Sequence, residues 1–391
     1  MALPVPNTAL TELACQFCEA PGLREFTEFP PLPRVTSDCR PYPAGGRLLS
    51  CDACGAVQKA PDQRWFEDIS RIYAGYEAYH QAGGAEQPVV DPATNELALR
   101  SDVIARYLNT QLTLRDGQRV LDVGCGNGVT LEALARLSTR LRLFGVEFDD
   151  RSLPRLNAIP GFERLFVGAM DRIPFEFDLV SLVHSLEHFP NPAKALFDAA
   201  SKVRKDGALF VEVVDSPNNP FDLVIADHMA HFSAASLAGL ARRQGLHVRS
   251  VEPNLVRREL AMLCGKTAPA TESSAPLEGA APGFASRNLT WLSTVLREAA
   301  RAASQHDVFG LFGSSIAATW LADAVGDRVQ FFVDEDPART GRRHLDRPIV
   351  TPREVPSGAA VYVGMAPVSA RAVGARLSGS RLNLLMPPRL D

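Results

Sequence analysis

Four cysteines near the start of the chain have the spacing of a metal site. Cys15 and Cys18 form one Cys-x-x-Cys pair, and Cys51 and Cys54 form another. Each pair makes a tight turn that presents two thiolates to one metal ion, and two such turns complete a tetrahedral site. Four protein ligands leave no open coordination position, so we expect a structural zinc ion (Zn2+). Cys39 lies between the pairs and is expected to be a bystander.

A glycine-rich turn follows a short apolar run. Val120–Val123 carries Asp122 and breaks into Gly124-Cys125-Gly126-Asn127-Gly128. Glycines let the backbone turn sharply and approach a ligand, because they have no Cβ to clash. The helix that begins behind them favours polar or anionic groups at its N-terminus. Glu147 ends the next expected strand about twenty residues on, where a carboxylate can hold ribose hydroxyls. This unit predicts a nucleotide-like cofactor, and a dinucleotide remains possible at this point.

A third concentration of reactive side chains lies shortly before Ser233. Asp227 and His228 are adjacent, and His231 follows. Histidine is the usual general base near neutral pH, and a neighbouring carboxylate can orient it and stabilise its charged form. Ser233 is expected to cap the following helix. The alternative interpretation is a pair of surface or capping histidines.

The central part of the chain, about residues 95–265, alternates expected strands and helices. Helices are expected at Thr130–Leu137, Pro192–Val203 and Ser233–Arg243. This alternation predicts an open, doubly wound α/β sheet of seven strands. The expected strands are Arg119–Val123, Leu141–Val146, Arg164–Val167, Phe177–His184, Ala208–Val214, His247–Glu252 and Glu259–Cys264.

Two smaller units flank this centre. Residues 15–73 are rich in proline and show little periodicity. Such a segment lacks the apolar content for a core of its own, so we expect a bound metal ion to stabilise it. Residues 266–283 are rich in Ala, Pro, Ser and Gly, which indicates a linker. A small α/β unit should follow, with expected elements at Asn288–Ser304, Val308–Phe312, a helix from Ile316, Val329–Val333 and Ala360–Val363. We expect domains at 1–75, 76–268 and 285–391.

The composition narrows the functional classes. The chain has 391 residues, of which 46% are hydrophobic and 22% are charged, as in ordinary globular proteins. A net charge of −4 is not typical of a protein that binds nucleic acid or a membrane surface. No apolar stretch approaches the about 18 residues of a membrane span, and no secretory signal is evident. We expect a cytoplasmic monomer or homodimer whose seven cysteines bind metal or stay free.

Three details favour S-adenosylmethionine over a dinucleotide as the cofactor. Asp122 stands directly before the glycines, and the DxGxGxG spacing differs from the GxGxxG of dinucleotide folds. The segments Gly168–Phe175, Phe177–Val180 and Leu186-Glu187-His188 then follow in order. Over about residues 101–265, the chain resembles the class I S-adenosylmethionine-dependent methyltransferases, which have a Rossmann-like fold.

That resemblance implies roles for individual residues. Gly124 and Gly126 would line the methionine part of the cofactor, and Glu147 would bind the ribose. Asp122, which could hold the amino-acid end, Cys125 and Gly128 complete the cofactor-binding motif. Met170 and Asp171 would border the adenine, while Ala169 stands where many relatives have an acidic residue. His184, at the end of the fourth strand, would lie near the sulfonium group. Glu187 and His188 are either structural or part of the active site.

The layout of the whole chain resembles the three-domain, zinc-containing C-methyltransferases that act on sugar nucleotides in deoxysugar pathways. The features that carry this likeness are the paired Cys-x-x-Cys motifs, the segment Tyr73-Ala74-Gly75-Tyr76-Glu77-Ala78-Tyr79 and the Asp227-His228 pair. That family usually has Glu-His where this chain has Asp-His, and commonly an aromatic residue at the position of His231. Its C-terminal domain usually carries a lysine-containing glycine loop, whereas Gly310–Ser315 here has no lysine.

The implied chemistry is methylation of a carbon next to a ketone. Such a carbon is a weak acid, so it needs a base and stabilisation of the enolate. His228 would remove the proton and Asp227 would orient it, with His231 nearby. Tyr76 or Tyr79 would donate a hydrogen bond to the enolate oxygen, although packing of the zinc segment is an equal alternative for both tyrosines.

Two other functions remain open at this stage. The altered C-terminal loop and Asp227 also suit a methyltransferase that acts on oxygen or nitrogen of another small molecule. A non-catalytic protein that binds zinc and a nucleotide is the third possibility, which the intact glycine motif disfavours. The C-terminal unit either binds the nucleotide of the substrate or only supports the active site.

Overall fold

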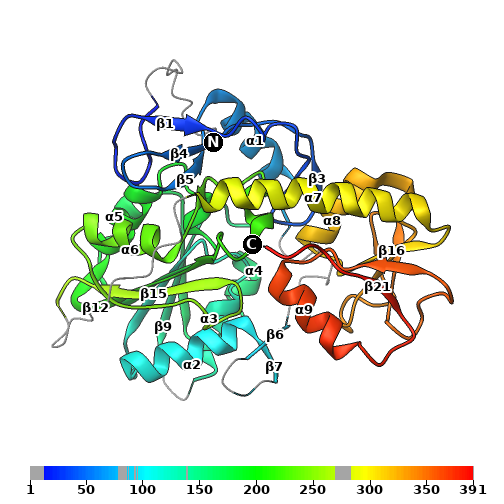
Figure 1. Cartoon of the computed structure of the whole chain (residues 1–391). Coiled ribbons are helices and arrows are strands. Elements are labelled where there is room, and N and C mark those ends of the chain that lie inside the picture. Colours follow the sequence, from blue (N-terminus) through cyan, green and yellow to red (C-terminus); the bar gives the residue numbers. More distant parts are fainter. Residues whose placement is uncertain are drawn as a thin grey trace.

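The computed structural model describes residues 13–77, 86, 88–91, 94, 96–137, 140–268 and 283–390. Tyr79 and most of the expected linker lie outside these residues. A small cysteine-bearing unit lies against a central α/β unit, and a second α/β unit stands beside both (Figure 1). The three-part α/β architecture expected from the sequence is therefore confirmed.

The central unit is built on a seven-stranded sheet with the order β10-β9-β8-β11-β12-β15-β14. All neighbours run parallel except β15, which is antiparallel to both β12 and β14. The strands are β8 (Arg119–Val123), β9 (Arg142–Glu147), β10 (Phe162–Val167), β11 (Phe177–Val183), β12 (Val203–Val214), β14 (His247–Glu252) and β15 (Glu259–Gly265). The seven strands expected from the sequence are all present, and their ends differ by a few residues.

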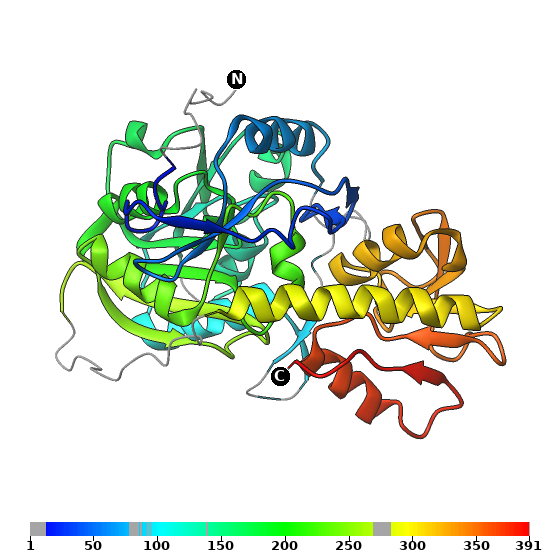
Figure 2. The ribbon, with the colours of Figure 1, turned by 45° about the horizontal axis from the view of Figure 1, so that its top comes forward.

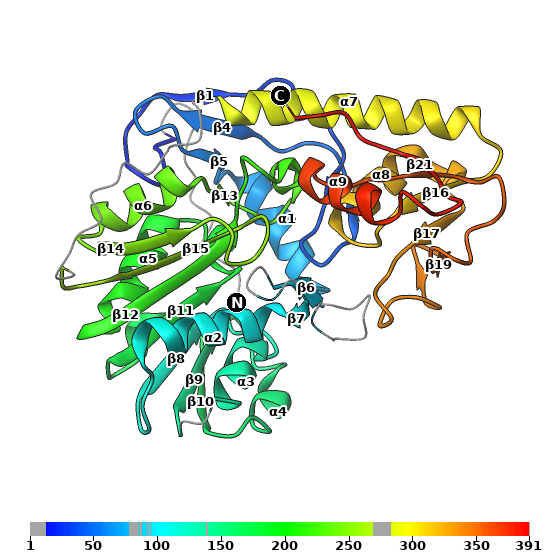
Figure 3. The ribbon, with the colours of Figure 1, turned by 60° about the horizontal axis from the view of Figure 1, so that its bottom comes forward.

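Helices cover both faces of this sheet. In β12, Ala208 and Phe210 pack into one apolar cluster, whereas Leu209 and Val211 pack into another on the opposite face. This alternation follows from the two-residue period of a strand. Helices α2 (Arg100–Leu112) and α3 (Val129–Ala135) lie on one side, and α5 (Pro192–Ser201) and α6 (Ala234–Arg243) on the other (Figure 3). With both faces covered, the carboxyl ends of the parallel strands are left to form a site.

Side-chain caps fix where α5 and α6 begin. The side chain of Ser233 accepts a hydrogen bond from the backbone N–H of Ser236, and the backbone N–H of Ser233 donates one to Ser236 Oγ, which makes a capping box. The expected cap at Ser233 is therefore confirmed. Asn191 caps α5 in the same way, with Pro192 at the first helical position.

The cysteine-bearing unit shares its sheet with the central unit. Its strands β1 (Leu23–Glu25), β4 (Leu48–Cys51) and β5 (Val57–Lys59) are completed by β13 (Ala230–His231), in the order β1-β4-β5-β13. Strand β13 belongs to the segment that carries Asp227 and His228. Apolar residues of this unit also join the clusters of its neighbours, which fits the expectation that it has too little apolar surface for a core of its own.

The C-terminal unit has a six-stranded sheet in the order β18-β19-β17-β16-β20-β21, with β18 antiparallel at one edge. Helix α7 (Phe284–Gln305) runs as one long helix from the central unit along this unit (Figure 2). Phe221 of the central unit contacts Trp291 of α7 and Trp320 of α8, at ring-centroid distances of 5.5 and 5.7 Å. The strands and helices are β16 (Phe309–Phe312), β17 (Phe331–Val333), β18 (Arg343–His344), β19 (Arg347–Val350), β20 (Ala360–Tyr362), β21 (Asn383–Leu385), α8 (Ile316–Val325) and α9 (Pro367–Arg376).

Further elements lie within these units. They are α1 (Gln63–Ala74), α4 (Leu153–Leu156), β2 (Arg34–Val35), β3 (Pro41–Tyr42), β6 (Pro88–Val90), β7 (Leu97–Leu99) and the 3₁₀ turns η3 (Met170–Arg172), η4 (Leu186–His188), η5 (Pro220–Val224) and η6 (Gly326–Arg328). Among the described residues, none of the helices combines the length and apolar character needed to cross a membrane.

Candidate active site and metal centre

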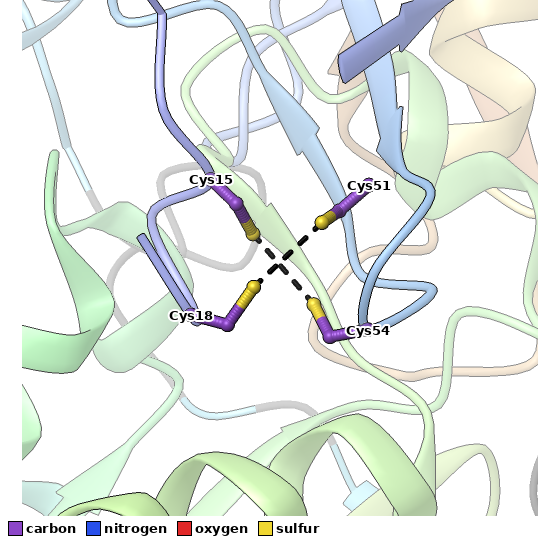
Figure 4. Close-up of side chains that lie close together, drawn as sticks. All are labelled: Cys15, Cys18, Cys51 and Cys54. Carbon is purple, nitrogen blue, oxygen red and sulfur yellow. Dashed lines mark hydrogen bonds between the residues drawn. The ribbon is translucent and has the colours of Figure 1, made fainter. Parts of the chain in front are cut away.

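The four cysteines converge on one point (Figure 4). The Sγ atoms of Cys15 and Cys54 lie 3.7 Å apart, as do those of Cys18 and Cys51. A tetrahedral zinc ion with Zn–S bonds of about 2.3 Å places its sulfur atoms about 3.8 Å from one another. The four thiols therefore fit a metal ion of this kind, as the Cys-x-x-Cys spacing predicts.

Each cysteine pair is shaped by a turn with a left-handed residue behind it. The backbone N–H of Glu19 donates to the carbonyl of Cys15, and that of Gly55 donates to the carbonyl of Cys51, both at 2.8 Å. Glu19 and Gly55 have φ angles of 60° and 71°. The two knuckles thus have the same geometry, one before β1 and one between β4 and β5.

The glycine motif forms the turn between β8 and α3. Gly124, Gly126 and Gly128 all have positive φ, at 74°, 51° and 81°, a region that other residues rarely adopt. A Cβ on Gly124 would lie 2.6 Å from the Cβ of Ser185, so only glycine fits there. A Cβ on Gly126 would meet nothing within 4 Å, because this glycine faces open space. That open space is a cradle in which a ligand can approach the backbone.

Two carboxylates flank the glycine turn. Asp122 is buried, and its Oδ1 accepts a hydrogen bond from Ser181 Oγ at 2.7 Å. Burial raises the pKa of Asp122 to about 7. Glu147 ends β9, and its Oε2 accepts a hydrogen bond from the N–H of Gly126 at 3.3 Å. Burial also raises the pKa of Glu147 above its ordinary value. The structure thus brings Glu147 to the glycine turn, where a ribose would meet it.

Three other residues expected at the cofactor lie in different settings. Cys125 is buried, and its Sγ would be 2.5 Å from a Cβ on Gly145, so its side chain packs under β9 and leaves only its backbone at the turn. Met170 is buried in the apolar cluster of the central sheet, whereas Asp171 beside it is exposed. These two residues begin the turn η3, which follows β10.

His184 directly follows β11 and is surrounded by buried carboxylates. Its imidazole nitrogens lie 3.3 Å from Glu187, 3.4 Å from Glu212 and 3.6 Å from Glu259. Burial alone would lower the pKa of His184, but Glu259 and the other two carboxylates raise it to about 10. His184 is therefore an imidazolium at neutral pH, and Arg100 contributes a second positive charge to this cluster.

The carboxylate that holds His228 is Asp222. His228 Nδ1 lies 2.7 Å from Asp222 Oδ1, and both side chains are buried. Asp222 lies in η5, and Ser216 Oγ donates a further hydrogen bond to its Oδ2 at 2.5 Å. Burial opposes ionisation, but His231 and His228 hold the pKa of Asp222 well below its usual range. The expectation that Asp227 orients His228 is thus corrected, because the adjacent side chain turns elsewhere.

Asp227 contacts two other elements. Its carboxylate accepts hydrogen bonds from the N–H of Ser37 at 2.8 Å and from Ser37 Oγ at 2.5 Å. His188 Nδ1 lies 3.4 Å from Asp227 Oδ2. Burial opposes the shift, but this contact keeps the pKa of Asp227 below its usual value and that of His188 above it. Asp227 therefore joins the cysteine-bearing unit to η4.

His231 is fully buried below the site. Its Nδ1 lies 2.7 Å from Asp222 Oδ2, and its Nε2 lies 3.1 Å from Lys59 Nζ. Burial and the Lys59 charge lower the pKa of His231 to about 4. The expected place of His231 among the groups that touch a substrate is thus corrected. His231 contacts Asp222 at Oδ2, whereas His228 contacts it at Oδ1.

Tyr73 in the last turn of α1 and Tyr76 just after the helix reach the histidines from the other side. Tyr73 Oη lies 3.0 Å from His188 Nδ1, and the Tyr73 and Tyr76 rings are in edge contact with centroids 5.4 Å apart. Tyr76 Oη lies 3.3 Å from Ser37 Oγ. His188 and His228 pack edge to face, with centroids 4.7 Å apart. Tyr73, Tyr76, His188 and His228 thus form one contiguous group of polar rings.

Glu187, His188 and His228 each offer a ligand atom within 4.8 Å of the others, which is a second arrangement that can hold a metal ion. Glu187 already faces the imidazole of His184 at 3.3 Å. Because His184 carries a positive charge, it supplies the counter-charge that a cation would otherwise provide. We therefore interpret these three residues as an acid–base cluster.

Comparison with known families adds the observation that decides the class. Residues 96–251 match the family model described as "Methyltransferase domain", and they contain the glycine turn, Glu147 and His228. The chain is a methyltransferase. Its central unit is a class I domain that uses S-adenosylmethionine, and the match begins before α2 and ends in β14.

The methyltransferase domain also resembles curated relatives. The chain is 29% identical over 165 residues to the ubiquinone biosynthesis O-methyltransferase of Neisseria meningitidis serogroup C, a match that covers 36% of this chain and 68% of the relative. It is 28% identical over 222 residues to the enzyme of the same name from Xanthomonas euvesicatoria, covering 51% of this chain and 89% of the relative. These matches concern the methyl-transferring core and leave the acceptor of this chain open.

Among solved structures, the methyltransferase in complex with the Haloferax volcanii Trm112 activator matches 43% of this chain and 90% of its own length. The TM-score is 0.37 and the sequence identity is 19%. A likeness at this level says nothing about substrate.

Asp222, Lys59 and Ser37 are residues of the site that the sequence alone does not predict. Asp222 and His228 belong to the same segment, but they are not adjacent in sequence, so the sequence does not indicate that their side chains are in contact. Lys59 and Ser37 lie in the cysteine-bearing unit, far from the histidines in sequence. The β5–β13 pairing brings Lys59 close, and the bridge between Val35 and Ile225 brings Ser37 close. These pairings join distant parts of the chain, and a segment without periodicity does not indicate them.

Proposed function

We propose that this methyltransferase transfers a methyl group to carbon in a nucleotide-linked 4-keto-deoxysugar, with His228 as the base. The observation that carries this proposal is the buried His228–Asp222 pair, which lies next to Glu187 and His188 of η4, the turn that directly follows the Ser185 packed against Gly124. A carbon acid next to a ketone is a poor proton donor, so its methylation demands a positioned base more than most acceptors do. The four-cysteine unit and the C-terminal α/β unit agree with the layout of the sugar C-methyltransferases.

The residues present suit S-adenosylmethionine. Gly124 and Gly126 provide a turn that a ligand can approach closely, Glu147 stands where it would bind ribose hydroxyls, and Asp122 lies just before the turn. When bound, this cofactor supplies an electrophilic methyl group. Met170 and the exposed Asp171 would border the adenine, and His184 would lie toward the methyl-donating end.

His228 is set up to remove a proton through its Nε2 atom. Because Asp222 is an anion, its Oδ1 can only accept a hydrogen bond, so Nδ1 of a neutral His228 carries the hydrogen. Nε2 then keeps its lone pair. When His228 takes up a proton, Asp222 stabilises the imidazolium in the way that a buried carboxylate does in other catalytic pairs.

The neighbouring rings would hold the acceptor. Tyr76 is the described tyrosine that we propose as hydrogen-bond donor to the developing enolate oxygen, because its ring belongs to the group of polar rings that includes His228 and its hydroxyl lies 3.3 Å from Ser37 Oγ. Tyr79 was expected to share this role and lies outside the described residues. His188, held by Asp227 and Tyr73, would border the same space.

An O-methyltransferase is the second candidate. It is favoured by the names of the curated relatives, which are O-methyltransferases. A hydroxyl acceptor would also use His228 as a base, so the pair alone does not separate the two reactions. The position of the new methyl group does.

The test is an assay with S-adenosylmethionine and two acceptor panels, one of 4-keto-6-deoxysugar nucleotides and one of catechols and other phenols. Mass spectrometry after fragmentation locates the added methyl group. A methyl group on a ring carbon of the sugar supports the proposal. Transfer to a phenolic oxygen, with no sugar product, would replace it with the second candidate.

A further inference from the structure

Lys59 is buried, and all its donors are used. The Nζ atom lies 2.8 Å from the carbonyl oxygen of Leu223, 3.3 Å from that of Ile225 and 3.1 Å from Nε2 of His231. An ammonium group has three N–H donors and no acceptor, so these three contacts match it fully. Lys59 therefore binds two carbonyls of the segment that directly follows Asp222 and fixes the ring of His231.

These contacts set the hydrogens of both histidines. Because Lys59 donates to Nε2 of His231, the hydrogen of the neutral ring must lie on Nδ1, which then donates to Asp222 Oδ2 at 2.7 Å. Asp222 thus receives donors from His231, Ser216 and His228. A carboxylate with three donors cannot rotate without losing hydrogen bonds, and its Oδ1 stays aimed at His228.

We propose that Lys59 and His231 are positioning residues that hold Asp222, and through it the ring of His228, in the orientation that leaves Nε2 ready to take a proton. The proposal rests on the base role given to His228. Lys59 lies in β5, which pairs with β4 on one side and with β13 on the other, and β4 carries Cys51. The cysteine-bearing unit would therefore take part in positioning the base.

Charge supports the same conclusion. Burial lowers the pKa of Lys59 to about 7, so below neutrality Lys59 is charged and keeps His231 neutral. The titratable groups that act on His231 are Lys59 from β5, Asp222 from η5 and His228 from the segment before β13. A neutral His231 leaves the charge of Asp222 free for His228. Without Lys59, His231 would compete for a proton and for Asp222.

The experiment compares Lys59→Met with Gln58→Met in the full-length, metal-loaded protein. Gln58 is the equally buried neighbour in β5, and its Oε1 accepts from the N–H of Gln16 beside the cysteines. For Lys59→Met we expect kcat to fall about 10-fold or more at pH 8 and further at pH 6, while KM and cofactor affinity stay within about twofold. A wild-type kcat for Lys59→Met, or a loss that is the same at both pH values, would overturn the proposal.

A pair of substitutions at His231 tests the same point if Lys59→Met does not fold. The side-chain amide of His231→Asn can still donate to Asp222, whereas His231→Leu cannot. We expect His231→Asn to retain most of kcat and His231→Leu to lose about 10-fold or more. Equal activity of the two variants would contradict a positioning role.

Nuclear magnetic resonance of ¹⁵N-labelled histidine separates this proposal from the proposed function, since it needs no acceptor. In the wild type, we expect the neutral form of the His228 ring to carry its hydrogen on Nδ1 alone, because Nδ1 faces Asp222. In Lys59→Met we expect an exchange between both tautomers. A single Nδ1–H tautomer in both proteins refutes the positioning role. If His228→Ala proved active while the tautomers behaved as expected, the base assignment would fail and the positioning of the ring would stand.

Discussion

The Nδ1 atom of His228 lies 2.7 Å from Oδ1 of Asp222, although Asp227 is its neighbour in sequence. The carboxylate of Asp227 points instead to Ser37 and His188. Asp222 thus pairs with His228, whereas Asp227 links the cysteine-bearing unit to η4. The two carboxylates are close in the chain and equally buried, so they make a matched pair for experiment.

Asp222→Asn should impair turnover much more than Asp227→Asn. An asparagine amide cannot accept from three donors as a carboxylate does, and it gives no counter-charge to a protonated His228. We expect kcat to fall about 10²–10⁴-fold for Asp222→Asn and less than about 10-fold for Asp227→Asn. Steady-state kinetics with unfolding curves for both variants check this. Equal losses would mean that Asp222 has no special place in catalysis.

Gly126→Ala should weaken cofactor binding. Its backbone has a φ of 51° and its Cβ would enter the open space in front of the turn. Gly117→Ala is the control, because Gly117 has a φ of 81° with nothing within 4 Å and lies before β8, at the opposite end of the strand. Both variants should lose about 1–2 kcal/mol of stability through left-handed strain.

Calorimetric titration with S-adenosylmethionine separates the two glycine variants. Only Gly126→Ala should bind it more weakly, because its methyl group would occupy space in front of the turn that the ligand needs. We expect a loss of about 10-fold or more, which corresponds to about 1.4 kcal/mol or more of binding free energy. If both variants bound the cofactor like the wild type, the turn would not be the cofactor cradle.

The purified protein should contain one zinc ion per chain, held by four thiolates. Cys51→Ser should lose the metal and melt at a lower temperature, because a small unit without its own core depends on such a staple. Cys39→Ser should keep the metal, since Cys39 stands outside the four-sulfur cluster. Elemental analysis of the three proteins decides this, and metal-free wild type with an intact fold would rule out the site.

His184 should stabilise the fold in a pH-dependent way. Its pKa is raised from 6.5 in the unfolded chain to about 10 in the folded protein, because the carboxylates of Glu259, Glu187 and Glu212 outweigh burial. The folded state therefore binds the proton more tightly. The stabilisation is full below pH 6.5 and is lost as the pH rises toward about 10.

Urea unfolding of wild type and His184→Gln between pH 6 and pH 10 measures this stabilisation. The difference in unfolding free energy should be largest at pH 6 and shrink steadily. A difference that is independent of pH would show that His184 is not an imidazolium in the folded protein.

Much of the architecture could be predicted because it rests on local patterns. Apolar strands such as Arg119–Val123 and Phe177–Val183 are readable as runs, and the glycine spacing at Gly124–Gly128 identifies the turn between strand and helix. The cysteine pairs are equally local. Each of these features is determined by residues within one element or one turn.

The supporting residues of the site could not be predicted because they depend on distant contacts. The β5–β13 pairing joins residues separated by most of the central unit, and it alone places Lys59 against His231. The choice of Asp222 over Asp227 follows from the course of the backbone around η5. The charged cluster around His184 likewise gathers Glu212 from β12 and Glu259 from the region of β15, which have no common sequence motif.

The most direct measurement is hydrogen exchange without methyl transfer. Wild-type protein and His228→Gln are incubated with a 4-keto-6-deoxysugar nucleotide in deuterated water, in the presence of the demethylated product of the cofactor, and deuterium at the carbon next to the ketone is followed by mass spectrometry. We predict exchange with the wild type and a rate lower by about 10²-fold or more with His228→Gln. Exchange at the same rate with both proteins would contradict the assignment of His228 as the base.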